Sequence, residues 1–123
     1  KLPPDNPLTR EGVALGRRLF NEPALSSNNA VTCATCHREE AAFTDPGKPV
    51  STGVEGRQGK RNSMPLINLA WHTEFFWDGR VKGLRDQALH PIADPTEMNL
   101  PPEKAADKIA ASPAYAPLFE AVR

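Results

Sequence analysis

Cys33-Ala34-Thr35-Cys36-His37 is the stretch of sequence that decides the fold. The spacing Cys-x-x-Cys-His is typical of the attachment site of a c-type haem. Two thiols three residues apart, on a turn that opens a helix, can each add across a haem vinyl group and form a thioether. The adjacent His37 can then serve as the proximal axial ligand of the iron. The motif therefore predicts one covalent haem c bound through Cys33 and Cys36, with His37 as the iron ligand.

Other uses of two closely spaced cysteines fit this sequence less well. A structural zinc site takes four ligands in two close pairs, whereas His72 and His90 are far apart and far downstream. A thioredoxin-type redox pair follows a strand in a βαβ unit, and the sequence has no parallel-strand pattern. A disulfide within the motif would give His37 no role. Haem attachment is therefore favoured, with zinc binding and redox exchange as the open alternatives.

Composition sets limits on the fold and on the partners. Of the 123 residues, 39% are hydrophobic, and 13 prolines with 8 glycines indicate much irregular chain. The formal net charge is zero, from 15 basic and 15 acidic side chains, so nothing indicates nucleic acid or an anionic membrane surface as a partner. No apolar run approaches the ~18 residues of a membrane-spanning helix. We expect one domain whose core is enlarged by the haem.

The start of the chain bears on its location. Lys1-Leu2-Pro3-Pro4 has none of the features of a secretory signal peptide. Covalent haem attachment takes place outside the bacterial cytoplasm. We therefore expect that a signal peptide has been removed and that the protein is periplasmic.

Helix signals are short and are separated by long loops. Thr9 predicts the N-cap of a helix that runs to Phe20, and Gly12 and Gly16 on that helix predict close approach of a neighbouring element. Residues 44–65 hold four glycines and three prolines and predict a long loop, which in a compact domain is usually functional or disordered. The predicted fold class is all-α. Further helices are predicted at 33–41, at 66–71, at 83–89 before Pro91, from Pro101-Pro102 to 111, and at 113–122.

Several longer motifs follow one another in the order seen in bacterial dihaem cytochrome c peroxidases and MauG-like proteins. The chain resembles that family over nearly its whole length, and the string FWDGR followed by Gln, Pro and Glu-Met is far more specific than CxxCH alone. The resemblance implies a cytochrome c-like fold of short helices and long loops, and it matches the N-terminal, peroxidatic haem domain. The motifs are LGRRLFNEPALS at 15–26, CATCH at 33–37, STG at 51–53, RNS at 61–63, FWDGR at 76–80, QALHPI at 87–92 and EM at 97–98.

The resemblance implies a peroxide site that uses Glu97 and Gln87, on the distal side of the haem. Cleavage of peroxide to water requires that a proton move from its inner to its outer oxygen. A carboxylate such as Glu97 can make both transfers, first as general base and then as general acid. A neutral amide such as that of Gln87 can donate a hydrogen bond that holds the oxygen in place. The expected activity is reduction of hydrogen peroxide to water.

Two further residues take implied roles between domains. Trp77 matches a tryptophan that lies between the two haems of the family and can conduct electrons, although a large aromatic side chain is also a common core anchor. Asn62 matches a ligand of an interdomain calcium ion, which needs six or more oxygen ligands. Asp78 and Arg80 are expected to form a structural ion pair in a turn.

The chain departs from the family at the sixth position of the iron. Many members carry a histidine directly after the Ser-Thr-Gly segment, which ligates the resting iron and must leave before peroxide binds. Val54 stands at that position and cannot ligate iron. The resemblance therefore predicts an open, high-spin ferric site, as in MauG-like members. The other side chains that could supply a sixth ligand are Met64, His72, His90 and Met98.

The second departure is length. The family has a second CxxCH domain that passes electrons to the first, and residues 1–123 contain one such motif. We expect 1–123 to be a single haem domain that receives electrons from a second haem domain, on a longer or a separate chain, or from a small redox protein. A MauG-like variant of this hypothesis would oxidise a protein side chain. The alternative function is a single-haem electron-transfer cytochrome c with a closed, six-coordinate iron.

Overall fold

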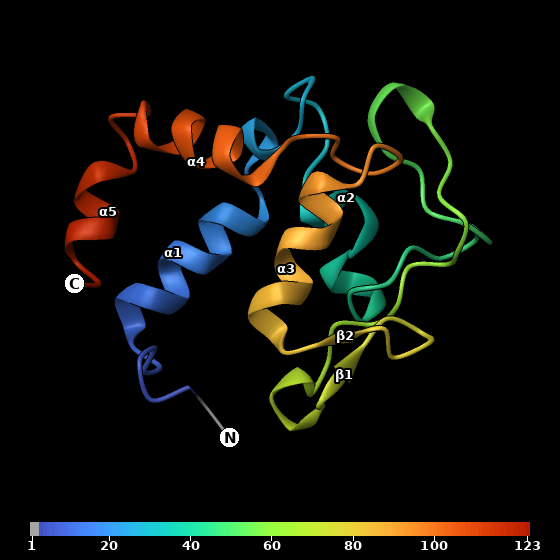
Figure 1. Ribbon diagram of the computed structural model, residues 1–123, viewed down its shortest axis with the longest axis horizontal. Helices are drawn as coiled ribbons and strands as arrows, with labels where there is room; N and C mark the ends of the chain where they lie inside the picture. Colours follow the sequence, from blue (N-terminus) through green and yellow to red (C-terminus); the bar gives the residue numbers. More distant parts are fainter. Residues whose placement is uncertain (1–2) are drawn as a thin grey trace.

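Helices make up most of the regular structure in the computed structural model, which describes residues 3–123 (Figure 1). The first two residues of the predicted domain, 1–2, lie outside the described range. The α-helices are α1 (Arg10–Phe20), α2 (Cys33–Cys36), α3 (Leu84–Ala93), α4 (Pro102–Ala110) and α5 (Ala116–Glu120). Single turns of 3₁₀-helix are η1 (Pro23–Leu25), η2 (Glu39–Ala41), η3 (Val54–Gly56) and η4 (Leu69–Trp71). The strands are β1 (Glu74–Phe75) and β2 (Val81–Lys82).

The first helix has the predicted boundaries. The Thr9 hydroxyl accepts a hydrogen bond from Gly12 N at 3.0 Å and so satisfies a free donor of the first turn. At the other end, the Asn21 side chain donates to Arg17 O at 2.9 Å. The predicted close approach at Gly16 is wrong, because no atom of another described element lies within 4 Å of the position that a Cβ would take.

The helix predicted at 33–41 is interrupted. Helix α2 ends at Cys36, because His37 leaves the helical region with φ −130° and ψ 78°. The turn η2 is a separate element, and after it Ala42 and Phe43 both adopt the left-handed conformation, at φ 55° and 58°. Two such residues reverse the chain and return it to His37.

The other predicted helices differ mainly in length. The segment 66–71 forms only η4, preceded by Asn68 in the left-handed region, and the helix predicted at 113–122 narrows to α5. Helix α3 runs past Pro91 to Ala93, whereas the sequence predicted that Pro91 ends it. A proline so near the end removes one hydrogen bond, and Ile92 packs against the core. Helix α4 ends one residue before the predicted 111.

A short antiparallel hairpin, whose turn is formed by the motif FWDGR, was not predicted. Phe75 pairs with Val81 and Glu74 with Lys82, and the first pair is buried. Two residues per strand are too few to show the alternation that identifies a strand in a sequence. The hairpin adds a small sheet to the predicted all-α fold, and the turn between its strands carries Trp77.

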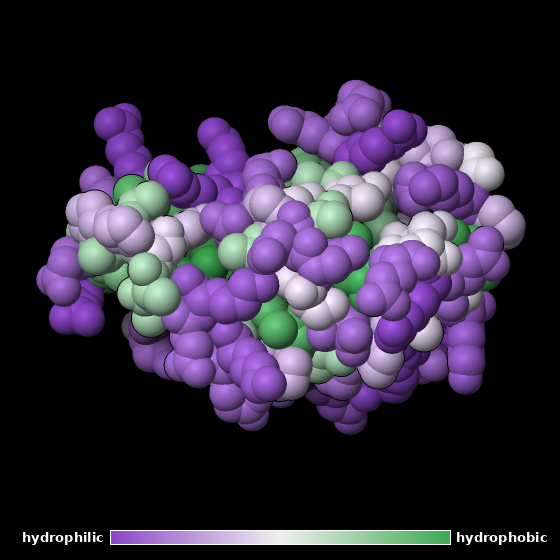
Figure 2. All heavy atoms as spheres, turned by 90° about the horizontal axis from the view of Figure 1, so that it is seen from above, coloured by the Kyte–Doolittle hydropathy of each residue, from purple (hydrophilic) through white to green (hydrophobic). Residues whose placement is uncertain are grey.

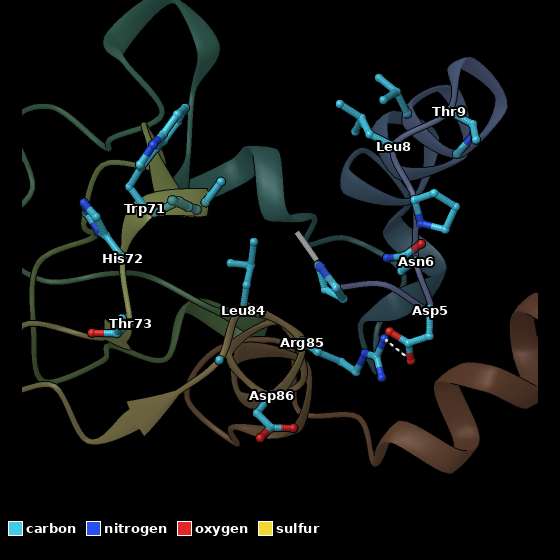
Figure 3. Close-up of a pocket in the computed structure, with 17 residues that line it drawn as sticks. Asp5, Asn6, Leu8, Thr9, Trp71, His72, Thr73, Leu84, Arg85 and Asp86 are labelled. Atoms are coloured by element: carbon cyan, nitrogen blue, oxygen red, sulfur yellow. Dashed lines mark hydrogen bonds and ion pairs between the residues drawn. The ribbon is translucent and has the colours of Figure 1, made fainter. Parts of the chain in front are cut away.

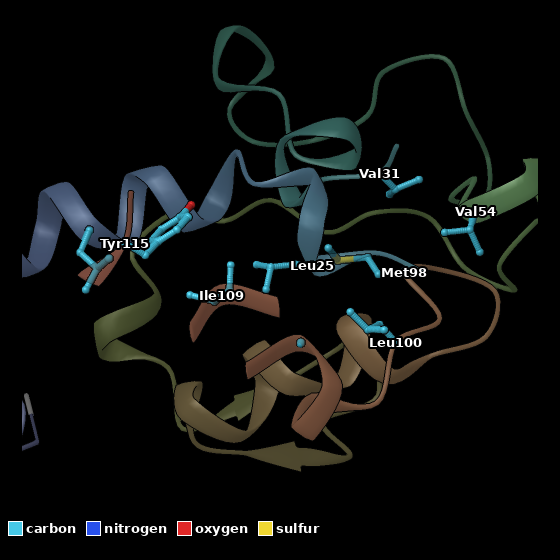
Figure 4. Packing of buried hydrophobic residues seen from close by; sticks show 9 residues of the cluster. Leu25, Val31, Val54, Met98, Leu100, Ile109 and Tyr115 are labelled. Atoms are coloured by element: carbon cyan, nitrogen blue, oxygen red, sulfur yellow. The ribbon is translucent and has the colours of Figure 1, made fainter. Parts of the chain in front are cut away.

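The apolar core lies between α1, η1, α4 and α5 and extends to the loop at Val54 (Figure 4). Figure 1 shows α3 between these helices and the long loops around α2. Tyr115 is 2% exposed, and its hydroxyl donates to Glu22 Oε1 at 2.9 Å, so that its one polar atom is satisfied. The cluster consists of Leu15, Leu25, Val31, Val54, Met98, Leu100, Ala105, Ile109 and Tyr115.

The segment 94–100 connects three parts of the molecule through its backbone. It follows α3, contacts the loop before α2 and contacts η3, so it joins the motif side of the domain to the helical side. Such bonds fix loops that have little apolar surface to bury. They run from Ser27 N to Met98 O at 2.9 Å, from Val54 N to Glu97 O at 2.7 Å, from Met98 N to Pro91 O at 3.1 Å and from Leu100 N to Ile92 O at 2.8 Å.

The face of the molecule shown in Figure 2 is mostly hydrophilic, with apolar residues visible between the hydrophilic ones. Trp71, Leu8 and Trp77 are large apolar side chains with 80%, 73% and 58% exposure. Within residues 3–123, none of the helices has the length and hydrophobicity needed to cross a membrane.

Gly53 permits the contact between η3 and the segment 94–100. A Cβ at this position would overlap the backbone atoms of Thr96 and Glu97. We expect Gly53→Ala to lower the free energy of unfolding by about 1–3 kcal/mol, the range for overpacking. Gly16→Ala is the matched control and should raise it by about 0.5–1 kcal/mol, because Gly16 is mid-helix with free space around it. Urea unfolding of the protein measures both, and an equal effect of the two substitutions would contradict the role of Gly53.

Candidate active site

One cavity of about 470 Å³ brings together side chains from the motif, the long loop, the hairpin turn, α3 and the segment 94–100. We call it the site cavity. Its lining includes His37 at the end of α2, Gln87 and Pro91 on α3, and the loop 59–64. The residues that line it and bear on its chemistry are His37, Lys60, Arg61, Asn62, Met64, Phe76, Trp77, Arg80, Gln87, Pro91 and Glu97.

His37 enters the cavity with a fixed tautomer. Its Nδ1 lies 2.8 Å from Phe43 O, and a carbonyl oxygen only accepts, so Nδ1 carries the proton. The other ring nitrogen, Nε2, is then left with a lone pair. Burial lowers the pKa of His37, against the opposing effects of the Phe43 and Met64 backbone and of the Asp45 charge. The neutral imidazole is the form that binds a metal.

The two thiols lie on one short helical turn. Thr32 and Thr35 form a capping box at the start of α2, which holds the turn in place. Cys33 and Cys36 are free and half-buried. Burial is the main cause that raises the pKa of both thiols, and the Glu97 charge adds to it. Glu97 is therefore near enough to the motif to affect it electrostatically.

Glu97 is a half-buried carboxyl whose backbone is held on both sides. Its N–H donates to Asp94 O at 3.0 Å, and its carbonyl accepts from Val54 N at 2.7 Å. Burial raises the pKa of its side chain, the charge of Asp94 raises it further, and Arg80 acts in the opposite direction. A carboxyl with a raised pKa is suited to exchange a proton near neutral pH.

Gln87 presents a buried oxygen with no partner. It lies on α3, and its Oε1 makes no hydrogen bond within residues 3–123. Unpaired buried polar atoms are uncommon in folded proteins and call for a ligand or water. Turning the carboxamide by half a turn would place its NH₂ donor in the same position.

Trp77 is held at the rim of the cavity. Its Nε1 donates to the backbone oxygen of Asn62 at 3.0 Å, and more than half of the side chain is exposed. The Asn62 side chain donates to Lys48 O at 2.6 Å. In the described residues, no group of three or more His, Cys, Asp or Glu side chains is arranged to hold a metal ion.

Three cationic side chains line the site cavity, namely Lys60, Arg61 and Arg80. None of them was predicted from the sequence to be a site residue. Arg80 stacks on the Phe76 ring with 3.6 Å between its Cζ and the ring centroid. The predicted ion pair is confirmed, since Arg80 lies 3.1 Å from Asp78 Oδ1. Arg61 also pairs with Asp78, at 3.2 Å. Only the arginine of FWDGR was a signal in the sequence, since a loop cation rarely reveals where it points.

The candidate sixth ligands are distributed over different parts of the molecule. Met64 lines the site cavity, whereas Met98 is buried in the apolar core. Val54, which stands where many family members have a histidine ligand, is buried in the same core. His72 and His90 are exposed and pack against the rings of Phe75 and Phe76. Of the four candidates, Met64 is therefore the one that the fold brings to the cavity wall.

A larger hollow of about 910 Å³ lies between the N-terminal lead, η4 and the start of α3 (Figure 3). Leu8, Trp71 and Leu84 give it an apolar lining, and His72 is also among its lining residues. The ion pair of Asp5 and Arg85, at 3.2 Å, also lies along this hollow. It contains none of the residues expected to act on peroxide.

Relatives of this chain include MauG proteins and cytochrome c peroxidases. A MauG protein ("Methylamine utilization protein MauG") from Methylorubrum extorquens is 44% identical over 95% of this chain and 33% of its own length. A "Cytochrome c551 peroxidase" from Pseudomonas aeruginosa is 34% identical over 92% of this chain and 32% of its own length. The chain thus spans about a third of the length of the relatives it matches.

Solved structures share the fold. A MauG-like protein associated with microbial copper homeostasis superposes with a TM-score of 0.87 at 37% identity, over 99% of this chain and 36% of that one. The diheme peroxidase BthA from Burkholderia thailandensis superposes with a TM-score of 0.78 at 29% identity, over 98% of this chain and 34% of that one. The family model described as di-haem cytochrome c peroxidase matches residues 10–122. This chain belongs to the di-haem cytochrome c peroxidase family.

Proposed function

We propose that residues 1–123 form a haem c domain that reduces hydrogen peroxide to water within a longer or multi-chain peroxidase. The observation that carries the proposal is that His37, Gln87 and Glu97 all line the same site cavity. The family membership supports the same chemistry. A periplasmic location follows from covalent haem attachment.

The residues present fit a covalent haem. The thiols of Cys33 and Cys36 are free to form thioethers, and His37 has an unprotonated Nε2 fixed by its bond to Phe43. Lys60 and Arg61 place positive charge on the cavity wall, which suits the carboxylates of haem propionates. A haem bound there would supply the iron that takes peroxide and the redox equivalents that cleave its O–O bond.

The proton chemistry is assigned to Glu97. As a carboxylate it accepts the proton of the inner peroxide oxygen, and as a carboxylic acid it delivers that proton to the outer oxygen, which leaves as water. Gln87 holds the oxygen by a hydrogen bond from its carboxamide. Because Glu97 is partly buried, water is excluded near it, and this strengthens its interaction with peroxide and the hydrogen bond from Gln87.

Electrons must reach the cavity from outside the described chain. Trp77 lies at the cavity rim with its ring exposed, where it can contact a second redox group and conduct electrons. We assign the donor to a second haem domain or to a small redox protein. Asn62 as a ligand of an interdomain calcium ion stays a prediction, and it needs oxygen ligands from outside this set.

The alternative, an electron-transfer cytochrome with a fixed sixth ligand, depends on Met64. Val54 cannot ligate iron, and its side chain is fully buried in the core. We expect the ferric haem of this chain to be high-spin by EPR and its spectrum to be unchanged by Met64→Leu. A low-spin spectrum that becomes high-spin in Met64→Leu would contradict the open site and favour the electron carrier.

Substitution of Glu97 tests the peroxidase directly. Glu97→Gln keeps the size of the side chain and removes its acid–base function, so haem attachment should be intact while the reaction with peroxide slows by about 10²–10⁴. Stopped-flow mixing with hydrogen peroxide measures the rate constant. The control is Glu55→Gln, at an exposed carboxylate paired with Arg57, which should react at the parent rate. If Glu97→Gln also reacts at the parent rate, Glu97 is not the catalyst.

The raised pKa of Glu97 predicts a pH dependence. Glu97 acts as a base only when ionised, so the rate constant should fall as the pH decreases through its pKa. Because burial raises that pKa, the fall should begin above the ~4.3 of an ordinary glutamate. The profile of the rate constant against pH should lose this limb in Glu97→Gln. A limb that persists unchanged in the variant would assign the titration to another group.

A further inference from the structure

Asp45 is a buried carboxylate that the proposed peroxide chemistry does not use. It is 6% exposed, and its Oδ2 makes no hydrogen bond within residues 3–123. The nearest cation is Lys48, whose Nζ lies 3.7 Å from the same oxygen, beyond hydrogen-bonding distance, on a half-exposed side chain. A buried charge so weakly compensated is costly unless another positive centre balances it.

The fold places this carboxylate next to the haem motif. Arg38 N donates to Thr44 O at 3.0 Å and the His37 ring bonds to Phe43 O at 2.8 Å, so the chain from 38 to 45 folds back on the motif. The charge of Asp45 accordingly acts on both Cys36 and His37. Asp45 does not line the site cavity, so it acts on the motif through space and does not contact peroxide.

A negative charge close to the iron ligand has a defined effect on the reduction potential of a haem. One-electron reduction of ferric iron lowers the charge at the metal by one, so a nearby carboxylate stabilises the ferric state relative to the ferrous state. The effect is strong where the carboxylate is shielded from water. A ferric resting state is the one that reacts with peroxide in the proposed function.

We infer that Asp45 is an electrostatic positioning residue that holds the reduction potential of the haem on this chain low, with Lys48 as its partial counter-charge. The inference rests on the proposed function, in which His37 is the iron ligand. It concerns a residue outside the cavity and a property distinct from peroxide turnover. It therefore has a readout of its own, the midpoint potential.

The test is a potentiometric titration of the haem-loaded protein that contains this chain. Asp45→Asn removes the charge and keeps the shape, and it should shift the ferric/ferrous equilibrium at least tenfold toward ferrous, a rise of about 59 mV for a one-electron couple. The matched control is Asp86→Asn, an exposed carboxylate on α3, which should leave the potential near that of the parent. A shift in Asp45→Asn no larger than that of Asp86→Asn overturns the inference.

Lys48→Gln provides a second test of opposite sign. Lys48 is half-exposed, so its substitution should leave the fold intact. It removes the positive charge that partly offsets Asp45, so the midpoint potential of the haem should fall. This variant decides the question if Asp45→Asn fails to fold, and an unchanged or higher potential overturns the inference. Haem content, measured after denaturation as the pyridine complex, separates the two proposals. A protein without haem refutes both, whereas haem with a potential indifferent to Asp45 and Lys48 refutes this inference alone.

Discussion

The backbone hydrogen bond from Val54 N to Glu97 O, 2.7 Å long, is the contact on which the arrangement of the site depends. It joins the loop after the haem motif to the segment 94–100, and it forms only because Gly53 has no side chain between the two backbones. The same bond buries Val54 in the core and leaves Glu97 half-buried at the cavity. A chain with few apolar residues thus fixes its site through loop backbone rather than through helix packing.

Local signals predicted the parts of the fold that local chemistry controls. The Thr9 cap, the start of α2 at Cys33 and the extent of α4 follow from capping and proline rules that act within one turn. The hairpin at 74–82 and the left-handed pair Ala42–Phe43 do not, because each is stabilised by contacts that a sequence does not display. Phe75 and Val81 pair because both are buried, and the reversal at 42–43 is held by the bond from His37 to Phe43 O.

For the site as for the fold, sequence motifs predicted some residues, and tertiary contacts placed others that the sequence did not indicate. The motif and the family resemblance named His37, Gln87 and Glu97, and the fold places all three at one cavity. Asp45 escaped sequence analysis because an aspartate beside a proline in a glycine-rich loop indicates a solvent-exposed turn. Its 6% exposure follows from the return of the loop to the motif, which is a tertiary effect.

Glu97 and Asp45 are two carboxyl groups near the motif that differ in their neighbours and in their proposed roles. Glu97 has the carboxylate of Asp94 as a neighbour, and with burial this raises its pKa, which favours a group that takes up and releases a proton. Asp45 instead lies 3.7 Å from Lys48 and outside the site cavity. Both charges act on Cys36 of the motif. A haem attached there would therefore lie near one carboxyl group that exchanges a proton in the proposed reaction and near a second that the reaction does not use.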